Sequence, residues 1–114
     1  MVIYDNLPVY KASYDLLLEI FMYVRWFKKE FKYSLWNEIK NEMLYLIRNI
    51  YKANSTFEKR KYYISLARES VETIRLYIRL CKDLHLISLE KFIKLNEKIE
   101  TISKQLTSWY KSCK

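Results

Sequence analysis

The chain has 114 residues, 51% of them hydrophobic, with a formal net charge of +8, one proline, two cysteines and no glycine. Its length predicts a single domain spanning residues 1–114. The absence of glycine excludes phosphate-binding loops that need a close backbone approach, and argues against sheets joined by tight turns. The excess of Lys and Arg favours a polyanionic partner, either nucleic acid or an acidic membrane surface.

The cysteines and the N-terminal residues indicate the compartment. Cys81 and Cys113 are far apart and make no disulfide framework, which suits a reducing environment. The N-terminus lacks the basic region, apolar run and cleavage site of a signal peptide. The most apolar run, residues 16–27, carries Glu19 and Arg25 and is too short to span a bilayer core of about 30 Å. We therefore expect a soluble cytoplasmic protein.

The first predicted helix covers residues 8–27. Pro8 suits the first turn of a helix, and Asn6 is a candidate N-cap. Apolar residues then recur at steps of three and four, which predicts one buried stripe. The stripe consists of Tyr10, Tyr14, Leu17, Phe21 and Val24, joined by Leu18 and Met22.

The second predicted helix covers residues 35–53. Residues 28–33 break the apolar pattern, and Ser34 is placed to cap the helix that follows, with Asn37 at its third position. The predicted buried stripe is Leu35, Ile39, Met43, Leu46 and Ile50, widened by Leu44 and Ile47.

The third predicted helix covers residues 57–85 and has two faces. The turn signal at residues 54–56 precedes it, with Ser55 or Thr56 as a candidate cap. Its predicted core stripe is Tyr63, Leu66, Ala67, Ser70, Ile74, Tyr77, Ile78, Cys81 and Leu84. At about 100° per residue, a second and roughly opposite stripe is cationic. It comprises Lys61, Arg68, Arg75, Arg79 and Lys82, with Glu72 within it, and is either a solvated face or a polyanion-binding surface.

The fourth predicted helix covers residues 89–111, capped by Ser88. Its predicted buried stripe is Phe92, Leu95, Ile99, Ile102, Leu106 and Trp109. Four helices of about 20 residues with short connections must run antiparallel to their sequence neighbours. The sequence therefore predicts an all-α, up-down-up-down four-helix bundle.

Some apolar residues exceed what one bundle core requires. Leu76 and Leu80 lie beside the core stripe of the third helix, and Tyr23 and Trp26 add aromatic surface to the first. They either line the edge of a wide core or form a second packed surface, which would make the protein a homo-oligomer.

The sequence offers little for catalysis or metal binding. The only histidine, His85, is preceded three residues earlier by Lys82, so the Glu-x-x-His pairs of bundle di-metal sites are missing. No cysteine pair has zinc-ligand spacing. We expect no metal, no cofactor and no enzymatic activity, and a position for His85 at a helix boundary or in a loop.

Short sequence patterns across residues 7–112 resemble one family of four-helix-bundle proteins. These patterns are LPVY at 7–10, FKYSL at 31–35, RLCKDL at 79–84, LIS at 86–88 and LTSW at 106–109. The family contains the accessory variability determinant, Avd, of diversity-generating retroelements and the proteins encoded in intervening sequences of bacterial 23S ribosomal RNA genes. The RLCKDL and LTSW patterns are more similar to the Avd group.

This resemblance implies a homopentameric ring of bundles with a basic surface. It also implies a non-catalytic partner of the retroelement's reverse transcriptase that binds template RNA or cDNA and supports mutagenic copying. The basic stripe is then the predicted nucleic-acid site. The alternatives are an intervening-sequence protein, a protein-interaction scaffold without nucleic-acid contact, and a module that binds a membrane surface.

Overall fold

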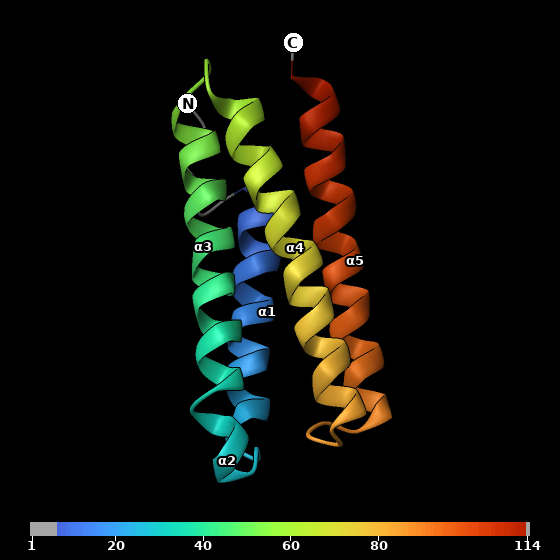
Figure 1. Cartoon of the computed structure of the whole chain (residues 1–114). Coiled ribbons are helices and arrows are strands. Elements are labelled where there is room, and N and C mark those ends of the chain that lie inside the picture. The colour runs from blue at the N-terminus through green and yellow to red at the C-terminus, as the bar shows by residue number, and fades with distance from the viewer. Residues whose placement is uncertain (1–6, 114) are drawn as a thin grey trace.

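The computed structural model describes residues 7–113, which form five helices joined by short turns (Figure 1). Four are long: α1 (Pro8–Val24), α3 (Leu35–Ser55), α4 (Arg60–Asp83) and α5 (Leu89–Ser112). The fifth, α2 (Lys29–Lys32), is a single turn between α1 and α3. The predicted all-helical class is confirmed.

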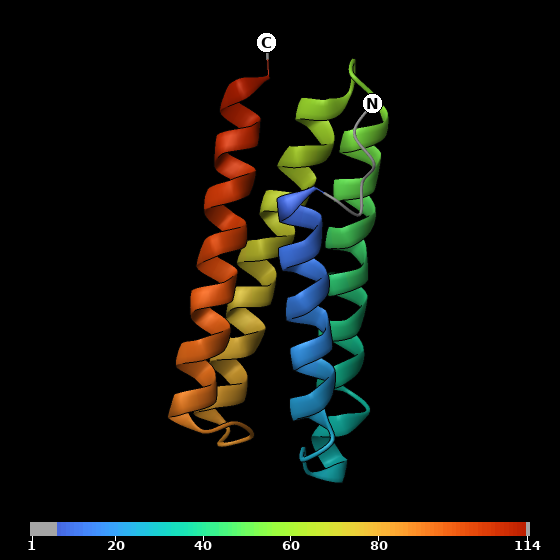
Figure 2. The same ribbon diagram turned by 180° about the vertical axis from the view of Figure 1, so that it is seen from behind.

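The long helices run antiparallel to their sequence neighbours, as predicted, in a body of about 44 × 23 × 21 Å (Figures 1 and 2). α3 packs against α4, α4 against α5, and α1 against both α3 and α5. α1 and α4 therefore occupy opposite corners of the bundle. α1 also begins well below the end at which α3 turns into α4 and α5 finishes; we call this the upper end.

The core is built from one apolar stripe per long helix. In α3, Leu35, Ile39, Met43, Leu46 and Ile50 are buried as predicted, but Leu44 is 44% exposed, so its assignment to the stripe was wrong. Asn49, Ala53 and Asn54 are also buried and were missed. In α5, the buried residues from Leu95 to Leu106 are predicted ones, whereas Phe92 and Trp109 are only partly buried. In α4, Ala67, Ile74, Ile78 and Cys81 are buried as predicted, but Ile64 and Val71 are also buried and were missed. Each fully buried Leu or Ile contributes about 1.5–3 kcal/mol. Leu84 is 37% exposed because it follows the last turn of α4, so its assignment to the core was wrong.

The predicted core stripe of the first helix was largely wrong. Tyr14, Leu18, Phe21 and Met22 are 45–61% exposed, although Leu17 and Val24 are buried as predicted. The core face is rotated to one side of the predicted stripe and consists of Val9, Ser13, Leu16, Leu17, Ile20 and Val24. The physical reason is that this helix carries apolar residues on two faces, so periodicity alone cannot choose which of them meets the core.

Several helix boundaries also differ from the prediction, including the end of α4, which lies at Asp83 instead of residue 85. α1 ends at Val24 instead of residue 27, because the amides of Trp26 and Phe27 bond to carbonyls three residues earlier, and Phe27 turns back into the core. The predicted break at residues 28–33 contains α2. α3 continues to Ser55, and α4 starts only at Arg60 instead of residue 57.

The helix caps agree only partly with the sequence. Ser88 accepts a hydrogen bond from the Lys91 amide at 3.2 Å, and Pro8 opens α1, both as predicted. The proposed Asn6 cap lies outside the described residues. Ser34 was wrongly predicted to cap α3, because its hydroxyl donates to the Glu30 carbonyl at 3.5 Å instead. Thr56 accepts from the Lys59 amide at 3.5 Å, within the turn that precedes α4.

His85 lies in the turn between α4 and α5, as expected. Its φ of 61° is left-handed, a conformation usually given to glycine at this position of a helix end. The Leu86 amide bonds to the Cys81 carbonyl at 2.9 Å, and the His85 amide to the Lys82 carbonyl at 3.0 Å. These two bonds form a Schellman motif. A chain without glycine therefore makes this tight reversal with histidine.

Candidate nucleic-acid interface

Four of the five predicted cations lie seven residues apart along one edge of α4. Because seven residues make about two helical turns, Lys61, Arg68, Arg75 and Lys82 face the same neighbour, α5. We call this row and its α5 partners the basic seam. The row is therefore not opposite the core, as the sequence indicated, but at the boundary between two packed helices. Arg79 lies off the row and is 73% exposed at its side chain.

The upper half of the basic seam presents cations over an aromatic ring. Lys61 Nζ lies 4.8 Å and Arg68 Cζ 5.0 Å from the centroid of Tyr110 on α5. Such cation–π contacts hold a cation in position without neutralising it. Within residues 7–113, neither Lys61 nor Arg68 forms an ion pair.

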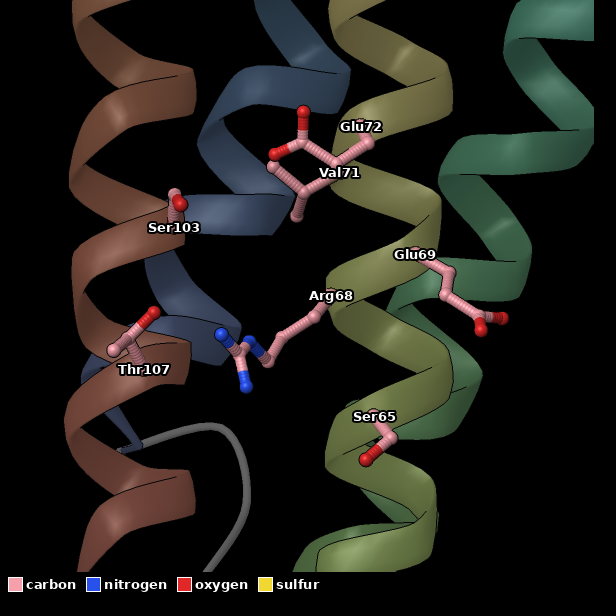
Figure 3. Close-up of a pocket in the computed structure, with 7 residues that line it drawn as sticks. All are labelled: Ser65, Arg68, Glu69, Val71, Glu72, Ser103 and Thr107. Carbon is pink, nitrogen blue, oxygen red and sulfur yellow. The ribbon is translucent and has the colours of Figure 1, made fainter.

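A groove of about 320 Å³ opens beside Arg68, between α4 and α5. Figure 3 shows Arg68 extending from α4 toward Thr107 of α5, while Glu69 points away from α5. The hydroxyl groups of Ser65, Ser103 and Thr107 also line the groove. Ser65 already donates to the Lys61 carbonyl at 3.0 Å. The Arg68 guanidinium with the hydroxyls of Ser103 and Thr107 suits a phosphate group, although Glu72 at one end of the groove limits how far an anion can extend.

The middle of the basic seam is neutralised. Arg75 binds Glu100 of α5 through Nη1, and its Nε lies 3.4 Å from Glu72 Oε2. Partial burial would lower the pKa of Arg75, but the hydrogen bond to Glu100 and the charges of both carboxylates raise it overall. With two carboxylates around one guanidinium, Arg75 holds α4 to α5 and leaves no positive charge for a partner.

The cations in the lower half of the basic seam are partly neutralised. Lys82 Nζ lies 4.8 Å from the Phe92 ring centroid and 3.6 Å from Asp83 Oδ1. Arg79 Nε lies 4.0 Å from the other oxygen of the same carboxylate. Two cations share one carboxylate, so one positive charge is left over.

The α5 side of the basic seam was not predicted from the sequence. Glu100, Ser103, Thr107 and Tyr110 recur at steps of three, four and three, which places them on one edge of α5. That spacing was readable from the sequence. It was overlooked because these residues are small, polar or negative, and only the helix pairing shows that they face the cations.

The predicted oligomer residues lie on two separate faces. Leu76 and Leu80 are 62% and 40% exposed on α4, and Trp26 is 73% exposed after α1. Tyr23 is half-buried within the chain, where its hydroxyl donates to Glu19 at 2.5 Å and Lys91 Nζ lies 5.0 Å from its ring centroid. The exposed residues of α1 named above enlarge the α1 face. Self-association stays a prediction.

The described residues show no grouping suited to metal binding. Within residues 7–113, no group of three or more His, Cys, Asp or Glu side chains is arranged to hold a metal ion. Burial raises the pKa of Cys81 from 9.0 to about 12, so its thiol stays protonated. Over the same residues, no helix combines the length and the apolar character needed to cross a membrane.

A family model described as bAvd-like matches residues 2–113, which is nearly the whole chain. No curated protein matches. The family match covers α1 to α5 and hence both sides of the basic seam.

Proposed function

The chain belongs to the bAvd-like family, and we propose that it is a non-catalytic accessory protein of a diversity-generating retroelement. In this role it binds the retroelement's reverse transcriptase and holds template RNA or cDNA on its basic seam during mutagenic reverse transcription. Family membership supports the retroelement association. The resemblance to Avd, set out from the sequence, supplies the expectation of the polymerase and nucleic-acid partners.

One observation carries the nucleic-acid part of the proposal: the upper half of the basic seam offers cations that no carboxylate of the described chain neutralises. Lys61 and Arg68 rest on Tyr110 beside a hydroxyl-lined groove. Phosphates that replace counterions at such cations gain affinity by counterion release, so binding should weaken steeply with salt.

A binding titration tests this proposal. A fluorescein-labelled single-stranded RNA is titrated with the protein from about 50 to 200 mM salt. We expect binding whose logarithmic affinity falls linearly with the logarithm of salt concentration. Absence of binding at the lowest salt, or an affinity indifferent to salt, would contradict nucleic-acid contact. Such a result would favour a protein scaffold, especially if a reverse transcriptase complex survives nuclease and high salt.

We also propose that the bundles assemble into a homopentameric ring. Exposed apolar residues occur on all four long helices; those on α1 include Leu18, Phe21 and Met22, those on α4 include Leu76 and Leu80, and α1 and α4 lie at opposite corners of the bundle. Two different faces suit a head-to-tail contact, in which the α1 face of one protomer meets the α4 face of the next. Such contacts form a ring when the rotation between successive protomers closes. Native mass spectrometry should show a species of five times the 14.1 kDa chain mass. A purely monomeric spectrum would refute the ring.

In a ring, the basic seam is repeated once in every protomer. Several weak sites on one assembly raise overall affinity through avidity, because a strand held at one site has a high effective concentration at the next. An RNA too short to reach a second protomer contacts one seam only. Its affinity should then fall far more than the loss of phosphates alone would predict.

A further inference from the structure

A second cavity lies at the upper end of the bundle, beyond the basic seam. It measures about 330 Å³ and is walled by Phe57 from the α3–α4 turn, Arg60 and Lys61 from α4, and Trp109 from α5. We call it the end pocket. Phe57 is 81% exposed, the largest exposure of any large hydrophobic residue in the described chain. An exposed aromatic ring beside a pocket offers a partner a flat apolar surface on which to stack.

Arg60 gives the end pocket a fixed cationic wall. Its Nε donates to the Ala53 carbonyl at 2.8 Å and its Nη2 to the Asn54 carbonyl at 3.3 Å. These bonds tie the guanidinium to the final turn of α3, where helix carbonyls lack partners within the helix. The Arg60 Cζ lies 5.7 Å from the Phe57 ring centroid and 5.9 Å from that of Trp109. The planar group is thus fixed beside two aromatic rings before any partner arrives.

The charge around the end pocket is strongly positive. Residues 57–68 and 109–113 carry one carboxylate, Glu58, against five cations: Lys59, Arg60, Lys61, Arg68 and Lys111. Lys61 lines the end pocket and also lies over Tyr110, beside Arg68. The end pocket and the upper half of the basic seam therefore form one continuous surface.

We propose that the end pocket takes an unstacked base of a single-stranded nucleic acid, whose neighbouring phosphates bind Lys61 and Arg68. Proteins that bind single strands combine exposed aromatic rings, on which bases stack, with cations along the backbone. The volume is at the lower limit for small-molecule sites, about 300 Å³, which suits one base and excludes a duplex. Glu58 in the wall disfavours a phosphate inside, but it can accept a hydrogen bond from an N–H group of a base.

This inference rests on the proposed nucleic-acid binding and can fail separately from it. The two probes are a labelled oligothymidylate and an abasic strand of equal length, which has the same phosphates and no bases. The variant is Phe57→Ala, and its matched control is Tyr33→Ala, since Tyr33 is 70% exposed at the opposite end of the bundle. Phe57→Trp restores a stacking surface.

We expect Phe57→Ala to weaken oligothymidylate binding about tenfold, which is within the range for loss of one stacked base, and to leave abasic-strand binding unchanged. Phe57→Trp and Tyr33→Ala should bind like the wild type. Equal weakening for both strands, or for neither, would overturn the end pocket as a base site while leaving phosphate binding intact. Failure of the wild type to bind either strand would overturn the proposed function itself. Because Phe57 is exposed, its replacement should leave the melting temperature unchanged, and circular dichroism checks this.

Discussion

Arg68 and Arg75 stand seven residues apart on the same edge of α4, yet their charges meet different surroundings. Arg68 lies 5.0 Å from the centroid of the Tyr110 ring, whereas Arg75 is bound by Glu72 and Glu100. An aromatic ring positions a cation and leaves its charge in place, but a carboxylate cancels it. Spacing thus puts a cation on the basic seam, and the residue facing it decides whether a polyanion can use it.

The largest expected effect comes from reversing the two uncancelled cations. Lys61→Glu with Arg68→Glu should lower affinity for a single-stranded RNA by roughly tenfold or more, because two attractive contacts become repulsive. The slope of affinity against salt should fall by about two. Fluorescence anisotropy over a salt series measures both quantities.

The matched control for this double reversal changes the same net charge elsewhere. Lys11→Glu with Arg48→Glu alters two exposed cations on α1 and α3, away from the basic seam. It should weaken binding much less. If both double variants lose affinity equally, net charge governs binding and the seam has no special role.

The second expected effect is a pH dependence of stability at the boundary between α1 and α5. There the Tyr23 ring lies beneath Lys91, and the Tyr23 hydroxyl donates to the Glu19 carboxylate. Burial, the bond to Glu19 and the nearby charges raise the pKa of Tyr23 from 10.0 to about 12. A raised folded-state pKa stabilises the fold below the unfolded value, and this contribution is lost as pH rises from 10 to 12. The loss should be well below the limit of about 1.4 kcal/mol per pH unit, because solvent screens a partly exposed group.

Urea unfolding at pH 9 and pH 11 tests this titration. Wild type should lose more free energy of unfolding over this interval than Tyr23→Phe, which has no phenol to ionise. Tyr14→Phe, at an exposed tyrosine of the same helix, should behave like the wild type. Identical pH slopes for wild type and Tyr23→Phe would show that the Glu19 contact does not govern this group. The contribution of Cys81 over the same pH range is common to all three proteins.

The third prediction separates binding from stability. Arg75→Gln should lower the free energy of unfolding by about 1 kcal/mol, because it removes partly exposed ion pairs that join α4 to α5. Arg68→Gln should change stability much less, since it has no carboxylate partner in residues 7–113. Equal stabilities of the two variants in urea would count against the structural role of Arg75.

The smallest effect is a gain. Glu100→Gln removes one of the two carboxylates at Arg75 and should raise affinity for RNA two- to threefold. The slope of log affinity against log salt concentration should become steeper by less than the amount expected for one added phosphate contact. Glu97→Gln, at an exposed carboxylate of the same helix, is the control. A gain of equal size in both variants would indicate a general charge effect.

Helix periodicity predicted most of the fold, but it did not predict which face of α1 meets the core. α3 has one main apolar stripe, and its five principal core residues were identified correctly, although Leu44 beside them is exposed. α1 is apolar on two faces, and Leu16, Leu17 and Leu18 satisfy more than one stripe. Which face meets the core depends on α3 and α5, so it could not be read from residues 8–24 alone.

At the candidate site, too, the sequence predicted the positions of residues on one helix but not their partners on another. A single-helix pattern identified Lys61, Arg68, Arg75 and Lys82 together, because it records position on α4. Their charge states depend on Glu100, Tyr110 and Phe92, which are far away in sequence and become partners only when α5 packs alongside. The Phe57–Arg60–Trp109 arrangement has the same origin, since it needs the α3–α4 turn and the end of α5 in one place.

The central claim is that carboxylate pairing, not position on α4, decides which cations hold nucleic acid. The most direct measurement is the salt dependence of RNA affinity for Arg68→Gln and for the double variant Arg75→Gln with Glu100→Gln, which removes a neutral pair. The slope should fall by about one for Arg68→Gln and stay at the wild-type value for the double variant. Equal falls in both would contradict the claim.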